Sequence, residues 1–388
     1  MLAKMITDEE VGVCVSGGLS SLAVAAWLAA SGVSTRAFIA DIGQANRDEI
    51  SLLARSLEAA GIPAVVVDLR DRMAQMAVDL VRYLARYEGG YWNTTGASRL
   101  VLVEGLTVAM REAGCGVLAH GCVGGGNDQL RFERYTAALA PGLRVFAPWP
   151  DPELRQRFPD RSAMEEYVQR RGLARDGRST ADYSVDGSLA GFAHEGTALE
   201  GLEVPDTAVR PFLTVLPRLA PDQPETVAVG FDRGQPVQIG GQPSGPRALL
   251  ESANALAGRH GIGLHSVVEN RINGTKCRGV YEAPGLDLLG FCVDRVYQVT
   301  IGKEARQLLS SLSELIGRSV YEGKYFDTEI RAARAAADVI TDSASANVEV
   351  DIYKGSVSFR GISHHGSRPL PARQTRFTGG GHIWKVTA

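Results

Sequence analysis

The sequence predicts an α/β protein: a parallel-sheet nucleotide-binding domain with helices on both faces, followed by a second α+β domain. Three observations support this fold class. Short apolar runs of strand length alternate with longer amphipathic stretches over roughly the first 150 residues. Within those runs, apolar residues follow one another instead of alternating with polar ones, as in strands that are buried on both faces. Beyond Pro150, the pattern changes to hairpins mixed with helices.

The first part begins with the apolar run at residues 11–15 (VGVCV), the first expected strand. A helix is expected over residues 22–30, with Gly32 as its end signal. The same criteria place strands at 35–40, 64–69, 116–120 and 143–146, and helices at 49–60, 73–87 and 98–113. In an open parallel sheet, ligands bind at the carboxyl ends of the strands, so we expect a nucleotide there.

The second part follows a Pro- and Arg-rich stretch around residues 150–161, which we interpret as a linker or surface excursion. Residues 172–205 are rich in Gly, Ser and Asp and receive no assignment. Hairpins are expected from strands 226–231 with 236–239 and 348–352 with 356–360, and helices at 162–171, 247–259, 304–316 and 328–339. We therefore expect domains at 1–165 and 166–360 and a C-terminal tail at 361–388.

Composition and charge exclude several classes of protein. A formal charge of −3 gives no bulk attraction to nucleic acid or anionic membranes, and no apolar run reaches the roughly 18–20 residues that cross a bilayer. Five scattered cysteines without C-x-x-C argue against a disulfide framework and a zinc site. The His364–His365 pair is interpreted as solvated. We expect a cytoplasmic protein with no nucleic-acid or membrane partner and no metal-ligating side chains.

Residues 16–21 (SGGLSS) lie between the first expected strand and helix. Glycines there let backbone N–H groups approach an anion, and the helix N-terminus adds about half a positive charge. Ser20 or Ser21 is expected to cap the helix. An ordinary strand–helix turn is the alternative interpretation. The segment is not G-x-G-x-x-G and lacks the P-loop lysine, so neither a Rossmann nor a Walker site is indicated.

This loop resembles the pyrophosphate loop of ATP-pyrophosphatases, S-G-G-[LIM]-D-[ST]. Residues 40–44 (ADIGQ) are similar to the A-[ND]-[IL]-G-Q of argininosuccinate synthases, and residues 120–133 (HGCVGGGNDQLRFE) to their H-G-A-T-G-K-G-N-D-Q-V-R-F-E. Segments 91–99, 147–149, 183–186 and 268–284 resemble four further motifs of argininosuccinate synthases, which occur in the same order along the chain. Over about residues 11–285, the chain resembles a divergent member of the argininosuccinate synthase family.

The resemblance implies an ATP-dependent ligase with Mg²⁺ that joins citrulline to aspartate, giving argininosuccinate, AMP and pyrophosphate. A urea carbonyl is a poor electrophile, so adenylating its oxygen supplies AMP as the leaving group before the amine attacks. Catalysis then needs charge stabilisation, a positioned ureido group and a neutral amine. Two alternatives stay open: a paralogous ligase of a specialised pathway that uses another amine, and a non-catalytic nucleotide- or amino-acid-binding protein.

Site roles carry over from the resemblance by position. The residues implied for the nucleotide are Ser16, Gly17, Gly18, Ser20, Ser21, Ala40, Gln44 and Gly121. The residues implied for citrulline are Tyr91, Asn127, Arg131, Ser184, Glu269 and Tyr281. The residues implied for aspartate or another amine are Thr95, Val123, Asn127 and Asp128. Catalytic roles fall to Asn127 and Asp128, with Arg99 near the phosphates.

Several positions depart from the family pattern. Ser20 replaces an Asp suited to Mg²⁺, and Val123 replaces a Thr that contacts aspartate. Gly125 replaces a Lys, and Ala193 replaces a Ser of the citrulline amino-group site. Gly96 carries less weight, because some members also vary there. The Gly/Pro-rich tail argues against the helix that holds a tetramer together, so we expect a homo-oligomer without support for a tetramer.

Overall fold

Five mostly apolar segments form the predicted parallel sheet. The computed structural model describes residues 9–44, 47–123, 126–173 and 182–363. The sheet has the order β3-β2-β1-β4-β5, and every neighbouring pair is parallel. Its strands are β1 (Val11–Cys14), β2 (Thr35–Asp41), β3 (Ala64–Asp68), β4 (Val117–His120) and β5 (Arg144–Phe146). The expected strands are confirmed to within two residues at each end.

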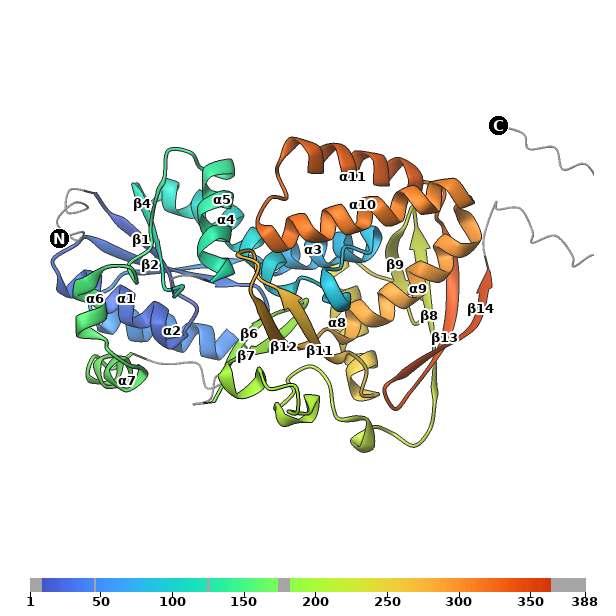
Figure 1. The fold of residues 1–388 in the computed structure, drawn as a ribbon, viewed down its shortest axis with the longest axis horizontal. Helices are drawn as coiled ribbons and strands as arrows, with labels where there is room; N and C mark the ends of the chain where they lie inside the picture. The colour runs from blue at the N-terminus through green and yellow to red at the C-terminus, as the bar shows by residue number, and fades with distance from the viewer. Residues whose placement is uncertain (1–8, 45–46, 124–125, 174–181, 364–388) are drawn as a thin grey trace, which may run out of the picture.

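Helices cover both faces of this sheet, as expected for strands apolar on both sides (Figure 1). One face packs on the core cluster that contains α1 (Leu19–Ala30), α2 (Arg47–Ala59), α6 (Pro152–Arg157) and α7 (Arg161–Arg170). The other packs on α3 (Arg70–Tyr83), α4 (Thr94–Glu112) and α5 (Asn127–Leu139).

One predicted helix boundary in this part was wrong, and two segments to which no helix was assigned contain one. Helix α3 ends at Tyr83 instead of residue 87, because Leu84 adopts a left-handed conformation with φ of 46°. The stretch around residues 150–161 contains α6, whose start is capped by Asp151. Asn127 and Asp128, which received no secondary-structure assignment, begin α5.

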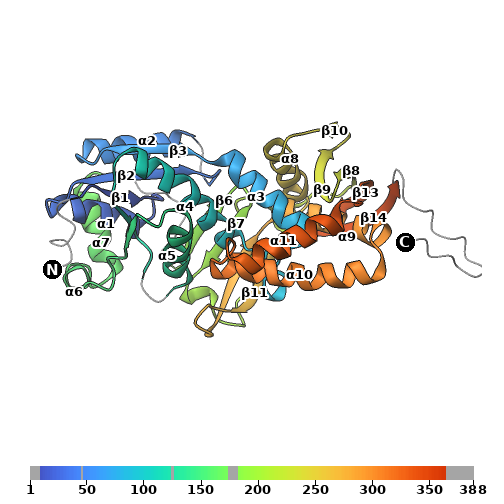
Figure 2. The same cartoon turned by 90° about the horizontal axis from the view of Figure 1, so that it is seen from above.

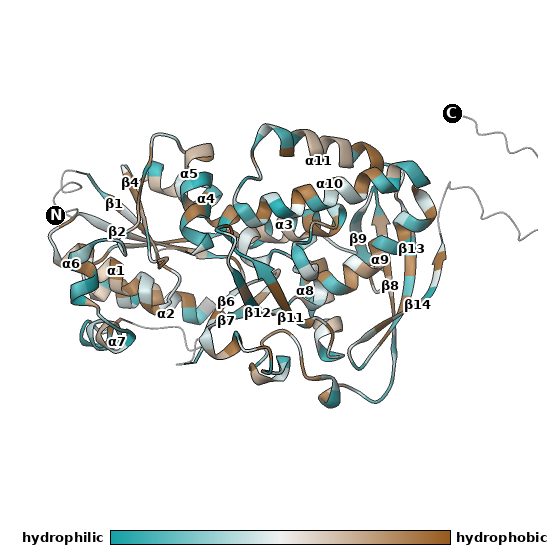
Figure 3. Ribbon diagram, viewed as in Figure 1, coloured by the Kyte–Doolittle hydropathy of each residue, from teal (hydrophilic) through white to brown (hydrophobic). Residues whose placement is uncertain are grey.

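At the other end of the molecule, an antiparallel sheet of order β10-β9-β8-β13-β14 packs on helices. Both predicted hairpins are confirmed; at residues 353–355, Lys354 (φ 41°) and Gly355 (φ 84°) form a tight left-handed turn. Figure 3 shows apolar and polar bands along the helices, as expected for elements with one buried face. The strands are β8 (Glu225–Asp232), β9 (Gln235–Ile239), β10 (Gln242–Pro243), β13 (Ala346–Tyr353) and β14 (Ser356–Ser363), and the helices α8 (Pro246–Arg259), α9 (Pro284–Thr300), α10 (Lys303–Glu322) and α11 (Thr328–Thr341).

A third, antiparallel sheet of order β11-β12-β7-β6 lies between the other two (Figure 1, Figure 2). The sequence did not reveal this sheet: its hairpins β6–β7 and β11–β12 lie in segments that received no assignment, and the pairing of β7 with β12 that joins them spans about 90 residues of the chain. Its strands are β6 (Ser184–Ser188), β7 (Gly191–Glu195), β11 (Leu264–Asn270) and β12 (Lys276–Glu282). Short 3₁₀ turns are η2 (Glu88–Gly90), η3 (Thr197–Leu199), η4 (Asp206–Ala208) and η5 (Pro217–Leu219).

One hydrophobic core runs through both ends of the chain, from Phe38 on β2 to Val229 on β8 and Ile352 on β13. Because α3 packs on both α8 and α9, the first part of the chain is tied directly to the second. The domain limits at 165 and 360 stay a prediction. Gly125, His364–His365 and the tail beyond Ser363 lie outside the described residues. Within the described ranges, no helix is long and apolar enough to cross a membrane.

Candidate active site

The site lies where the strand order of the parallel sheet reverses, at the carboxyl ends of β1 and β4. The chain leaves β1 toward β2 on one side, whereas β4 lies on the other side of β1, so the loops after β1 and β4 border one crevice. Gly121 follows β4 so closely that a Cβ there would lie 2.5 Å from the backbone nitrogen of Ser21. The loop after β4 therefore rests on the first turn of α1.

The loop after β1 leaves the N-terminus of α1 open to an anion. Gly17 has φ of 84°, and Gly18 is the N-cap without a side-chain cap. The predicted capping by Ser20 or Ser21 was therefore wrong: the Ser21 hydroxyl donates to the carbonyl of Gly18 at 2.8 Å instead. Since α1 also lacks an acidic residue in its first turn, its N–H groups and partial positive charge suit a phosphate.

The loop after β2 forms a second border of the crevice. Gln44 donates from Nε2 to the carbonyl of Ala40 at 2.7 Å, and its Oε1 accepts from the N–H of Ile42 at 2.8 Å. Leu189, between β6 and β7, donates its N–H to the carbonyl of Ile42 at 2.8 Å. Gln44 thus braces the backbone of this loop, and the β6–β7 turn closes over it.

One face of the third sheet forms the opposite wall. The register pairs Asp186 with Ala193 and Ala193 with Tyr281, and side chains of directly paired residues lie on the same face. Glu269 pairs with Cys277 on that face too. Together with the loops of the parallel sheet, this wall encloses a cavity of about 440 Å³. The loop after β1 and the third sheet therefore face each other across one cavity.

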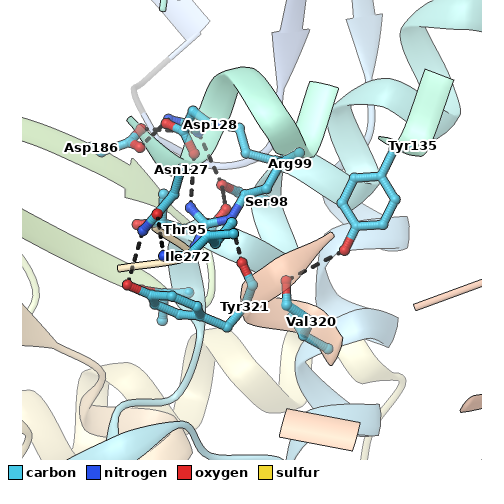
Figure 4. Close-up of polar contacts among 12 residues, drawn as sticks. Thr95, Ser98, Arg99, Asn127, Asp128, Tyr135, Asp186, Ile272, Val320 and Tyr321 are labelled. Atoms are coloured by element: carbon cyan, nitrogen blue, oxygen red, sulfur yellow. Dashed lines mark hydrogen bonds and ion pairs between the residues drawn. The ribbon is translucent and has the colours of Figure 1, made fainter. Parts of the chain in front are cut away.

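Side chains of alternating charge link β6, α4 and α5 inside the cavity: Asp186, Arg99, Asp128 and Arg131. Figure 4 labels the first three. Arg99 contacts Asp128 Oδ2 at 2.9 Å and both carboxylate oxygens of Asp186. Arg131 contacts Asp128 Oδ1 at 2.8 Å. Burial opposes ionisation of Asp128, but Arg99 and Arg131 outweigh it and lower its pKa to about 2. Asp128 is therefore a carboxylate that holds the start of α5 against Arg99.

The far end of the cavity combines a carboxylate with tyrosines. Tyr91 stacks on Tyr281 with ring centroids 4.0 Å apart. Glu269 accepts a hydrogen bond at Oε1 from the Tyr321 hydroxyl at 2.7 Å. Its Oε2 is buried and has no partner among the described residues. Burial raises the pKa of Glu269, although Tyr321 and Arg131 oppose that shift. A cationic group at Oε2 would complete the site.

Most residues implied by the resemblance converge on this cavity. Those that line it are Ser16, Gly18, Ser20, Ser21, Ala40, Gln44, Tyr91, Thr95, Arg99, Gly121, Val123, Asn127, Asp128, Arg131, Ser184 and Glu269. Gly17 and Tyr281 do not line it; Gly17 shapes the loop and Tyr281 supports Tyr91. Arg131 donates hydrogen bonds to Asp128 Oδ1 at 2.8 Å and to the carbonyl of Tyr321 at 2.7 Å.

Sequence reasoning gave no role to several residues that line the cavity, among them Asp186, His120 and Tyr321. Asp186 and His120 stood in the quoted segments but received no role. The His120 ring is buried beside Phe132, and burial lowers its pKa to about 4, so the ring is neutral near neutral pH. Tyr321 lies in a helix without any motif, and only the packing of α10 brings it to the cavity.

Comparison with known proteins decides the family. Residues 10–174 match the model of the arginosuccinate synthase N-terminal HUP domain, and residues 183–367 match the arginosuccinate synthase C-terminal domain. The argininosuccinate synthase of Edwardsiella ictaluri is 34% identical over 350 residues, covering 89% of this chain and 85% of that protein. The chain belongs to the argininosuccinate synthase family.

Other members of the argininosuccinate synthase family are similarly distant. The protein of Syntrophobacter fumaroxidans is 35% identical over 352 residues, covering 90% of this chain and 86% of that one. The chloroplastic argininosuccinate synthase of Arabidopsis thaliana is 34% identical over 363 residues, covering 91% and 71%. Family membership makes the chain an ATP-dependent ligase that acts on small molecules.

Proposed function

We propose that this protein condenses citrulline with aspartate through an adenylated ureido intermediate, releasing AMP and pyrophosphate. One observation carries the proposal: the uncapped N-terminus of α1 and the carboxylate of Glu269 line the same cavity. That arrangement lets the α-phosphate of ATP meet the ureido oxygen of citrulline, while the amino-acid end of citrulline is held at Glu269. Bringing two reactants together in this way supplies much of the rate acceleration.

At the nucleotide end, the loop at residues 16–18 and the first turn of α1 would hold the phosphates that leave as pyrophosphate. Positive charge there stabilises the departing anion. Ser20 offers Mg²⁺ only a neutral hydroxyl, and Asp128 and Asp186 are already held by Arg99. The ion, which neutralises phosphate charge when bound, would therefore take its ligands chiefly from phosphates and water.

At the acceptor end, the ammonium of citrulline would bind Glu269 Oε2, and its ureido group would lie toward Asn127 and Asp128. Once the ureido oxygen carries AMP, the neutral amine attacks the ureido carbon, and AMP leaves with that oxygen. An ionised Asp128 beside the new C–N bond suits the positive charge that develops on the attacking nitrogen.

A second candidate is a related ligase that uses another amine. Val123 is 61% exposed at the rim of the cavity, where the family pattern has a Thr that contacts aspartate. An exposed apolar side chain at this position favours an amine with less charge. A homo-oligomeric state and a cytoplasmic location stay predictions.

Pyrophosphate release tests the proposal. The purified protein is incubated with ATP, Mg²⁺ and citrulline, alone and with aspartate or with amines that lack carboxylates. Release that depends on aspartate is the expected result. Release with another amine only would establish the second candidate, and no release under any combination would indicate a non-catalytic binding protein.

Val123→Thr is expected to raise kcat/KM for aspartate by roughly tenfold, because the new hydroxyl can donate to a carboxylate without a change of side-chain shape. The matched control is Val108→Thr, since Val108 is 45% exposed on α4 and does not line the cavity. Steady-state kinetics with varied aspartate measure the effect. Equal kinetics for wild type and V123T would show that no aspartate carboxylate lies at this rim.

Ser20→Asp is expected to lower the Mg²⁺ concentration needed for half-maximal activity, because a carboxylate at the loop adds a hard oxygen ligand. Titrating Mg²⁺ at fixed ATP measures the effect. Ser310→Asp, on the exposed part of α10, is the control for added negative charge. An unchanged Mg²⁺ dependence in S20D would remove the loop from the metal site.

A further inference from the structure

The C-terminal end of α10 docks on α5 through its last carbonyl groups. Side chains three and four residues apart lie on one helix face, and α5 uses such a face to bind consecutive carbonyls of α10. The contacts are Arg131 Nε to Tyr321 O at 2.7 Å, Tyr135 OH to Val320 O at 3.4 Å, and Arg134 to Glu322 O. Two guanidinium groups at the negative end of a helix are electrostatically favourable. This docking fixes the last turn of α10 beside the site (Figure 4).

Gly96 lets the same turn lie directly on α4. A Cβ at position 96 would be 2.7 Å from the carbonyl oxygen of Val320, too close for any side chain without a shift of α10. Tyr321 is thereby pressed into the wall of the cavity, where it is 1% exposed and stacks on Tyr87 with centroids 3.7 Å apart. Its hydroxyl position is set by packing on both sides.

That hydroxyl joins a hydrogen-bond chain with one direction. The N–H of Ile272 donates to Asn127 Oδ1 at 2.9 Å, so Asn127 must present Nδ2 on its other side. Nδ2 donates to the Tyr321 hydroxyl at 2.9 Å, and the hydroxyl therefore donates onward to Glu269 Oε1 at 2.7 Å. All three hydrogen bonds therefore run in one direction, from the backbone N–H of Ile272 to the carboxylate of Glu269.

The chain has a consequence for ligand binding. Because Tyr321 occupies Oε1, the remaining oxygen of Glu269 is the one left for a ligand, and its side chain is 3% exposed. We propose that Tyr321 is a positioning residue for the acceptor. It holds Glu269 and Asn127 in one arrangement, so that the acceptor's cationic end and its ureido end are placed together. This inference rests on the proposed function.

Tyr321→Phe removes the hydroxyl and keeps the ring. We expect the dissociation constant for citrulline, measured calorimetrically with α,β-methylene-ATP present, to rise roughly ten- to hundredfold, as for loss of a hydrogen bond to a charged group. Affinity for the ATP analogue should change by less than about twofold, which also shows that the variant is folded. The control is Tyr87→Phe, because the Tyr87 hydroxyl donates to the carbonyl of Asn270 and not to Glu269. The Y87F variant should bind citrulline like wild type.

A double-mutant cycle with Glu269→Gln tests whether Tyr321 acts through Glu269. If it does, Y321F should weaken citrulline binding far less in the E269Q background than in wild type. An equal factor in both backgrounds, or wild-type affinity in Y321F, would overturn the positioning role. Wild-type protein that binds the ATP analogue but no citrulline would overturn the proposed acceptor, and the positioning role with it.

Discussion

Gly121→Ala is expected to abolish tight ATP binding. The added Cβ would lie 2.5 Å from both the nitrogen and the Cα of Ser21. These are backbone atoms of the first turn of α1, and no side-chain rotation can relieve the contact. The loop after β4 or the start of α1 must move, and a displacement of about 1 Å at a reacting group typically costs around a hundredfold in rate.

Isothermal titration with ATP measures this effect, and thermal unfolding reports whether the fold persists. The matched control is Gly142→Ala, because a Cβ at position 142 meets nothing within 4 Å. The control should bind ATP like wild type. Wild-type ATP affinity in G121A would show that the nucleotide does not lie in the crevice at the carboxyl ends of β1 and β4.

Asp128→Asn is expected to lower kcat/KM by at least about a hundredfold and to destabilise the fold by roughly 3–5 kcal/mol. The carboxylate contacts Arg99 and Arg131 at 2.9 and 2.8 Å. Its loss leaves Arg131 without a carboxylate among the described residues, while Arg99 keeps Asp186, and an unpaired buried charge is strongly destabilising. Urea unfolding measures the stability. Asp342→Asn is the control, because its ion pair with Arg233 is exposed and worth little.

The stability effect of D128N has a defined pH dependence. The pKa of Asp128 is lowered to about 2 in the folded protein, so its stabilisation is present above the unfolded pKa of about 3.9. That stabilisation is lost as pH falls through the folded pKa. The difference between wild type and D128N should therefore narrow between about pH 4 and pH 2. A constant difference across that range would show that the carboxylate charge does not stabilise the fold.

Local sequence signals were enough to predict the parallel sheet, because its strands are short apolar runs separated by glycine and amphipathic helices. They were not enough for α5. This helix starts with Asn127 and Asp128, which favour turns, and its Arg131 and Arg134 are ordered by carbonyls of α10 about 190 residues away along the chain. The third sheet was missed for two reasons: its local hairpins β6–β7 and β11–β12 received no assignment, and the pairing of β7 with β12 that joins them depends on long-range contacts.

In the candidate site too, some features follow from local sequence and others from long-range contacts. Its nucleotide loop is local, so residues 16–18 could be assigned from their position between a strand and a helix. The resemblance supplied residues such as Glu269 and Asn127, but not their connection. Tyr321 joins them only after α10 has packed on α4 and α5. The hydrogen bonds of Gln44 to its own loop are local, whereas the bond from Leu189 that closes this loop is a tertiary feature.

The proposed function rests on the transfer of AMP to a ureido oxygen inside this cavity. Citrulline carrying ¹⁸O in its ureido group, incubated with the protein, ATP, Mg²⁺ and aspartate or another accepted amine, tests it directly by mass spectrometry of the AMP released. We predict one ¹⁸O atom in each AMP formed. AMP without the label would contradict transfer to the ureido oxygen, whatever the rate of ATP cleavage.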